Sequence, residues 1–137
     1  MRKLPSIALL LLVSVSAWLA NAADVADGKW IRRVPDEDHA RTNPLTRQPL
    51  AIAEGKQLFH LNCAKCHGTD ANGLRNRPSL RSPRIRHATD GDLAWMLRNG
   101  NPYKGMPPWT SLPEQERWQI IAYLRTLPPA APPAARK

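Results

Sequence analysis

The chain has 137 residues, enough for one small domain, and it is strongly basic, with 20 Lys and Arg against 11 Asp and Glu. Its only two cysteines, at positions 63 and 66, exclude a disulfide framework, because a bridge between them would close too small a loop to hold a domain together. Nucleic-acid binding is disfavoured, since aromatic and basic residues are not interleaved and no binding motif is present.

Residues 1–22 are predicted to be a signal peptide. Arg2 and Lys3 form a basic start, positions 7–15 are apolar, and positions 20–22 read Ala-Asn-Ala, a small-x-small cleavage site. The alternative, a membrane anchor, is disfavoured because the apolar run is shorter than the ~20 residues that cross a bilayer. We therefore expect a periplasmic, soluble mature chain without a stable membrane span.

Residues 23–49 are predicted to be an extended leader, because they are polar, contain Pro35 and Pro44 and show no sustained periodicity. Trp30, Val34 and Leu45 would attach this leader to the domain that follows. The alternative is a loosely ordered arm.

Residues 50–127 are predicted to form an all-α domain with three main helices. The first helix is expected over 50–62, where Gly55 and Phe59 lie four residues apart and so share one face. The second is expected over 90–99, with Thr89 as its N-cap and Gly100 just beyond its end.

The third helix is expected over 113–126, where Pro113 suits the first turn. Apolar residues then follow a helical spacing, at Ile120, Tyr123, Leu124 and Leu127. No alternating stretch indicates a strand.

Two segments carry no clear periodicity. Residues 68–89 form a long loop without a convincing helix or strand, which implies that the loop wraps around something. Residues 128–137 form a tail rich in Pro and Ala, which we expect to be disordered or polyproline-like.

Residues 63–67 read Cys-Ala-Lys-Cys-His, the C-x-x-C-H pattern of covalent haem attachment. Two thiols at this spacing can each add to one vinyl group of the porphyrin edge, and the neighbouring histidine is then directed at the iron. The pattern predicts one haem c, linked through Cys63 and Cys66, with His67 as an axial ligand. A haem would also supply the large apolar surface that such a small domain lacks.

The alternatives for the two cysteines are a redox dithiol and a structural zinc site. A thioredoxin-like dithiol needs a βαβ setting, and no strands are expected. A zinc site needs four ligands, and only His60 and His87 would be at hand to complete it.

Met106 is the predicted second axial ligand. It lies between Gly105 and Pro107, so its backbone should be extended and held in a stiff loop. A thioether is a soft ligand that favours reduced iron. Met96 is interpreted as core filling within the second helix, and His87 is the alternative ligand.

From about Ala51 to Leu127 the chain resembles the bacterial class I cytochromes c, which carry one haem with His and Met ligands. The matching pieces occur in the family's order: Gly55-x-x-x-Phe59, Cys63-Ala-Lys-Cys66-His67-Gly68, Pro78-Ser-Leu80, Asn99-Gly100, Gly105-Met106-Pro107 and Ala122-Tyr123-Leu124. The resemblance implies that the first and last helices cross, with Gly55 and Phe59 against the apolar stripe of the last helix.

The resemblance also implies roles around the haem. The Pro78 carbonyl should accept a hydrogen bond from the second ring nitrogen of His67, and Leu80 should lie on the haem edge. Trp95, Tyr103 and Trp109 would line the pocket or bind a propionate, or else simply belong to the core.

By the same resemblance, the protein should be a monomeric periplasmic one-electron carrier and not an enzyme. It looks similar to small cytochromes that accept electrons from periplasmic dehydrogenases of the quinoprotein type; a bc-type complex or a terminal oxidase are equally open as partners. The alternative is a haem-based ligand sensor or a peroxidase-like enzyme with a displaceable distal Met106.

The loops carry a concentration of positive charge. Between positions 68 and 110 three Asp are opposed by seven basic residues, Arg75, Arg77, Arg81, Arg84, Arg86, Arg98 and Lys104. This predicts an electropositive face that steers an acidic redox partner; the alternative is a solvated surface that maintains solubility.

Overall fold

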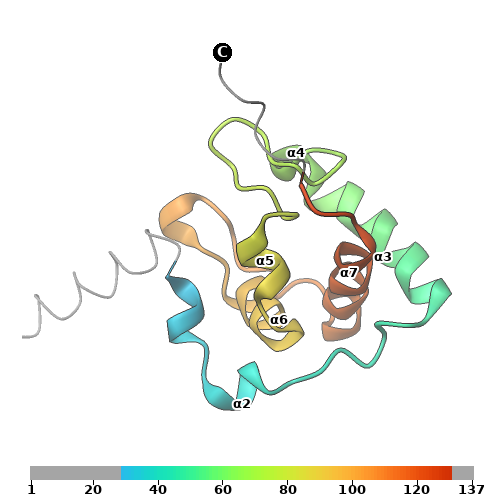
Figure 1. Cartoon of the computed structure of the whole chain (residues 1–137), viewed down its shortest axis with the longest axis horizontal. Helices are drawn as coiled ribbons and strands as arrows, with labels where there is room; N and C mark the ends of the chain where they lie inside the picture. Colours follow the sequence, from blue (N-terminus) through green and yellow to red (C-terminus); the bar gives the residue numbers. More distant parts are fainter. Residues whose placement is uncertain (1–28, 131–137) are drawn as a thin grey trace, which may run out of the picture.

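The computed structural model describes residues 29–130, which are helical and contain no named strand. The elements are η1 (Trp30–Arg33), α2 (Asp36–His39), α3 (Pro49–Asn62), α4 (Ala64–His67), α5 (Pro83–His87), α6 (Asp90–Asn99), η2 (Pro102–Lys104) and α7 (Glu114–Thr126). The prediction of an all-α fold with three main helices, here α3, α6 and α7, is confirmed (Figure 1).

α3 and α7 lie side by side, and a glycine of α3 lets the two helices approach closely (Figure 1). A Cβ added at Gly55 would lie 1.9 Å from the backbone oxygen of Gln119, so only a hydrogen atom fits there. One turn later the fully buried Phe59 packs against Tyr123, with ring centroids 5.5 Å apart. The packing expected from the family resemblance is therefore present.

α6 has the ends that its sequence predicts. Thr89 accepts a hydrogen bond from the Asp92 backbone, while the Asp92 carboxylate accepts one from the Thr89 backbone, which completes a capping box. At the other end Gly100 has a φ of 66° and donates its N–H to the Met96 carbonyl.

The described part of the leader is not extended, which corrects that prediction. It forms η1 and α2, and it is attached to the domain by buried side chains. Trp30 and Val34 belong to the core and Leu45 packs against it, as expected. Polar contacts add to this, because the buried Asn43 side chain donates to the Trp118 carbonyl at 2.9 Å.

The long loop also differs from the prediction, since residues 83–87 form the short helix α5. Ser82 in extended conformation and Pro83 in the first turn start this helix, and these are known helix-start signals. The Arg125 side chain of α7 donates hydrogen bonds to the carbonyls of Ile85 and Ala88, which secures α5 against the domain.

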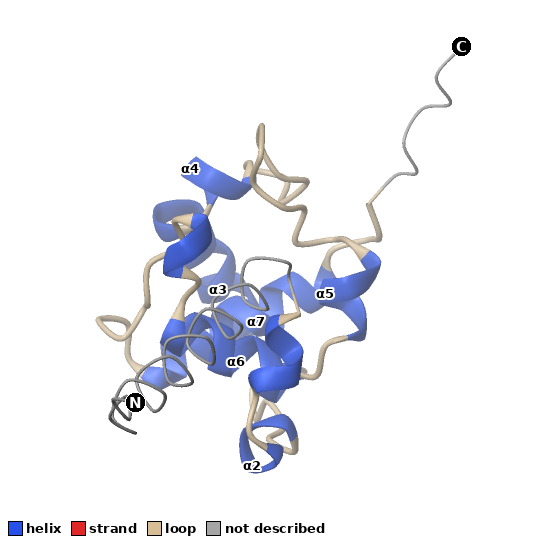
Figure 2. Ribbon diagram, turned by 90° about the vertical axis from the view of Figure 1, so that its left-hand side faces the viewer, coloured by secondary structure: helices blue, strands red, loops and turns tan. Residues whose placement is uncertain are grey.

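The buried side chains form two clusters. The larger cluster joins the leader, α6 and α7, and it includes Trp30, Leu93 and Ile121. The smaller cluster joins the end of α3, α4 and α7, and it includes Phe59 and Cys63. Figure 2 shows α3, α6 and α7 grouped together, with α4 at one end.

Three predictions concern the signal peptide, the C-terminal tail and the absence of a membrane span. The predicted signal peptide 1–22 lies outside the described residues. The first tail residues are held, because Arg81 donates to the carbonyls of Pro128 and Pro129 and its own carbonyl accepts from Ala130, so the prediction of disorder is wrong for 128–130. The rest of the predicted tail, 131–137, lies outside the described residues. Among the described helices, none combines the length and the apolarity that a membrane span requires.

Candidate functional site

The residues of the C-x-x-C-H pattern form the single turn α4, directly after α3. The N–H groups of Cys66 and His67 both donate to the Cys63 carbonyl, at 3.1 and 2.9 Å. Gly68, with a φ of 80°, ends the turn. Cys63 and His67 are buried whereas Cys66 is exposed, so the pattern lies at the edge of the core and not within it.

His67 is oriented by a backbone carbonyl. Its Nδ1 is 3.0 Å from the Pro78 oxygen, so the hydrogen bond implied by the family resemblance is present. With Nδ1 as the donor, Nε2 keeps its lone pair for a metal. Burial lowers the pKa of His67, and the Arg77 charge lowers it further against the opposing effect of the Pro78 bond. The ring is therefore held neutral, the form that coordinates iron.

The alternative uses of the cysteines fit the site less well. Burial raises the pKa of the Cys63 thiol to about 11, with a further increase from Cys66, whereas a redox dithiol needs a lowered pKa. Within residues 29–130, no three His, Cys, Asp or Glu side chains lie close enough together to hold a metal ion. A zinc site of four such ligands is therefore not formed in this part of the chain.

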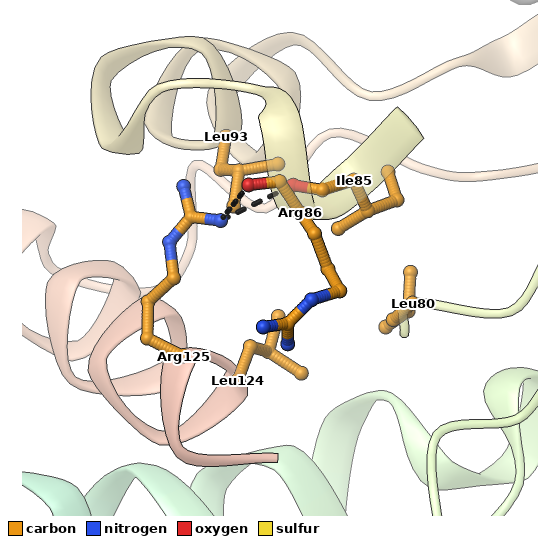
Figure 3. A pocket seen from close by; sticks show the side chains of 6 residues that line it. All are labelled: Leu80, Ile85, Arg86, Leu93, Leu124 and Arg125. Atoms are coloured by element: carbon orange, nitrogen blue, oxygen red, sulfur yellow. Dashed lines mark hydrogen bonds between the residues drawn. The ribbon is translucent and has the colours of Figure 1, made fainter. Parts of the chain in front are cut away.

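A cavity of about 70 Å³ lies where the two core clusters meet (Figure 3). Leu80 and Leu124, which line it, pack against the cluster that contains Cys63. Leu93, on the facing side, belongs to the other cluster. The cavity therefore lies where the two sides of the core meet, with Leu124 packed against both clusters, and four of its six lining residues are apolar.

Met106 lies on the opposite cluster from Cys63. It is half-buried and packs against the larger cluster, and its backbone pairs with Asn101 in an isolated antiparallel bridge. Met96 is buried in that cluster, in agreement with its interpretation as core filling. His87, the alternative ligand, is exposed on α5. Met106 and Cys63 thus pack with different core clusters, and the role of Met106 as a ligand stays a prediction.

The three aromatic residues suggested for the pocket do not line the cavity. Trp95 and Trp109 are half-buried and pack against the larger cluster, so the core interpretation describes them. Tyr103 is 55% exposed. Leu80, in contrast, lines the cavity, while its predicted place on the haem edge stays a prediction.

Four lining residues were not predicted from the sequence, Ile85, Arg86, Leu93 and Arg125, and Leu124 was not assigned to the cavity. The apolar stripe of the last helix identified Leu124 only as core. Ile85 and Arg86 belong to α5, a helix that the sequence analysis did not expect, so no signal directed attention to them.

The basic residues of the loops divide into two groups in the structure. Arg98 is not part of a free basic face, because its Nη2 pairs with the Asp38 carboxylate of the leader at 2.8 Å. The other six form no ion pair with an Asp or Glu of the described residues; they are Arg75, Arg77, Arg81, Arg84, Arg86 and Lys104. We call these six residues the basic loop set.

Comparison with known proteins points to one group. A family profile described as "Cytochrome C oxidase, cbb3-type, subunit III" matches residues 50–124. Subunit CcoP of the cbb3-type cytochrome c oxidase of Rubrivivax gelatinosus is 38% identical over 64 residues, and subunit FixP of Rhizobium meliloti (strain 1021) is 37% identical over 67. These matches cover 47% and 45% of this chain, but only 21% and 22% of the two subunits.

A solved structure is also similar. Cytochrome cL of the marine methylotrophic bacterium Methylophaga aminisulfidivorans matches with a TM-score of 0.57 and 27% sequence identity. The match covers 64% of this chain and 59% of that one. The arrangement of α3, α6 and α7 is therefore one that a c-type cytochrome also has.

Proposed function

Because this chain belongs to the c-type cytochrome domain family described as cytochrome c oxidase, cbb3-type, subunit III, we propose that it is a periplasmic one-electron carrier with haem bound at α4. The family implies covalent haem c and electron transfer. The periplasmic location is inferred from the predicted signal peptide. The class of electron donor is inferred from the similarity to small cytochromes.

The residues of this chain fit haem c by their chemistry. Cys63 and Cys66 would hold it through thioether links, and His67 and Met106 would be its axial ligands. When bound, the haem supplies an iron that gains or loses one electron. The protein contributes the orientation of the His67 ring through Pro78, a lowered pKa that favours the neutral imidazole, and apolar side chains such as Leu80 and Leu124 beside the site.

The observation that carries the proposal is the division of the core. The C-x-x-C-H side and the Met106 side belong to different clusters, and a cavity lined by four apolar residues and two arginines lies where these clusters meet. A small domain needs something large and apolar to unite such halves, and a haem has this character. The free Nε2 of His67 supplies the matching ligand.

We propose a periplasmic quinoprotein-type dehydrogenase as the electron donor. The similarity to cytochrome cL of a methylotrophic bacterium supports it, as does the likeness of the loops to small cytochromes that serve such enzymes. The curated relatives are oxidase subunits, so a terminal oxidase is a proposed acceptor. The basic loop set would dock an acidic patch of either partner.

Covalent attachment is tested by extraction. The protein is produced in a host with c-type cytochrome maturation machinery, and the haem should stay with the polypeptide in acidified acetone. Replacing both cysteines with alanine should release the haem or prevent its uptake, because both thioether links are removed. Haem that washes out of the unaltered protein would contradict the proposal.

Axial ligation is tested with a matched pair of methionine variants. Ferric wild-type protein should show the weak near-infrared band of methionine ligation, and Met106→Ala should abolish it and open the iron to cyanide. Met96→Ala removes a buried methionine from α6 and should keep the band. A high-spin ferric wild type that binds cyanide rapidly would instead favour the sensor or peroxidase alternative.

A further inference from the structure

One side chain joins the loop before Pro78 to the loop before Met106. Arg77 is half-buried, and its Nη1 donates a hydrogen bond to the backbone carbonyl of Lys104. Its guanidinium also lies against Gly105, where an added Cβ would be 3.0 Å from Nη1 and 3.2 Å from Nη2. Arg77 therefore contacts two consecutive residues that lead directly into Met106.

The first of these loops is held firmly on its own side. The Arg77 N–H donates to the Leu74 carbonyl at 2.8 Å and closes a turn. The next residue, Pro78, accepts the hydrogen bond of His67 Nδ1. A displacement of Arg77 would therefore be felt at the peptide that orients His67.

The second loop is a closed unit. Asn101 and Met106 exchange two backbone hydrogen bonds, at 2.8 and 3.0 Å, and η2 and Gly105 form the turn between them. Gly105 has a φ of 71°, a left-handed conformation that favours glycine. An anchor on Lys104 and Gly105 therefore positions the Met106 backbone as well.

We propose that Arg77 is a positioning residue that clamps the Met106 loop to the Pro78 loop and so keeps the Met106 thioether on the haem iron. This inference rests on the proposed function, since it requires His67 and Met106 to be the axial ligands. A guanidinium suits the task because its planar fork can donate to a carbonyl while it lies beside a residue without a side chain.

The same loop provides a control. Arg75 is exposed, and within residues 29–130 it makes no side-chain hydrogen bond or ion pair. Replacing Arg75 removes a positive charge close to Arg77 in sequence without removing a contact. Arg77→Lys is the complementary variant, because it keeps the charge and a donor but loses the planar fork.

The test measures how often the methionine leaves the iron. Cyanide binds ferric haem only when the axial position is vacant, so its association rate reports the opening of Met106. Arg77→Gln should raise this rate about tenfold, equivalent to ~1.4 kcal/mol, and weaken the near-infrared band. Arg75→Gln should stay within about twofold of wild type, and Arg77→Lys should fall between.

The outcomes separate this inference from the proposed function. A wild type without the near-infrared band overturns the proposed function itself. A wild type with the band, and an Arg77→Gln variant with the same band and cyanide rate, overturns only the clamp. A purely structural role would lower thermal stability and leave both readouts unchanged. Should Arg77→Gln fail to take up haem, Arg77→Lys decides, and a wild-type cyanide rate there overturns the clamp.

Discussion

Gly55 faces the backbone of α7 at a distance that no other residue type allows. Glycine inside a helix normally destabilises it by ~1 kcal/mol relative to alanine. At this position alanine should instead be less stable than glycine, because an alanine Cβ would overlap the Gln119 carbonyl. That carbonyl is part of the backbone and cannot move aside on its own. The packing of α3 on α7, and through it the position of α4, depends on this hydrogen-sized side chain.

Gly55→Ala should therefore lower the free energy of unfolding by about 3 kcal/mol, the upper part of the range for overpacking. Chemical denaturation followed by circular dichroism measures this. Gln57→Ala, an exposed position on the same helix, should change it by less than ~0.5 kcal/mol. Equal stability of Gly55→Ala and wild type would show that the helices are further apart.

α6 depends on its capping box as an element. Asp92 is only 1% exposed, and its carboxylate accepts from the Thr89 N–H and lies 2.8 Å from His39 Nδ1 of α2. One side chain thus closes the first turn of α6 and attaches α2 to it. The sequence indicates the first contact by spacing alone, whereas the second joins residues 53 positions apart.

Asp92→Ala should destabilise the protein by about 2 kcal/mol, since it removes a cap and leaves the part-buried Thr89 N–H without its acceptor. Thermal unfolding of the haem-loaded protein gives this value. The exposed Glu37→Ala serves as the comparison and should stay within ~0.5 kcal/mol of wild type. A similar small effect for both would mean that water replaces the cap.

The leader behaves in the structure as part of the domain. Trp30 is 5% exposed and belongs to the larger core cluster, whereas Arg33 in the same short helix is exposed. Trp30→Ala should lower the free energy of unfolding by about 3 kcal/mol, the usual cost of truncating a buried tryptophan, and Arg33→Ala by little. Equal, small effects in denaturation would favour the loosely ordered arm.

At the scale of the whole molecule, some basic side chains form ion pairs and others do not. Arg41, Arg98 and Arg125 form ion pairs with Glu114, Asp38 and Asp90, whereas the basic loop set forms no ion pair with a carboxylate of the described residues. The basic loop set therefore leaves unpaired positive charge on the segments that carry Pro78 and Met106. A partner with an acidic patch would approach this side of the protein first.

Reduction by a periplasmic quinoprotein alcohol dehydrogenase should accordingly slow about tenfold as salt rises from about 20 to 200 mM. The double variant Arg75→Gln/Arg84→Gln should flatten this dependence. Arg32→Gln/Arg47→Gln removes the same charge from exposed leader positions and should not. Stopped-flow kinetics measures the rates, and a flat wild-type response would support the solvated-surface interpretation.

Features that depend on neighbours along the chain could be predicted from the sequence. The three main helices followed from apolar periodicity and end signals such as Thr89 and Gly100, and the C-x-x-C-H pattern is contiguous. Helix caps and single turns are formed by residues a few positions apart, so their chemistry is visible in the sequence. The haem-binding roles of Cys63 and Met106 stay predictions of this kind.

Only the tertiary structure decided which distant groups meet. Asn43 donates a hydrogen bond to the Trp118 carbonyl, Arg98 forms an ion pair with Asp38, and Arg77 donates to the Lys104 carbonyl. No pattern in the neighbouring sequence predicts any of these contacts. For the same reason the sequence did not predict the short helices of the leader or α5. Short segments become helical mainly through packing against the rest of the molecule, and that contribution exists only once the whole chain has folded.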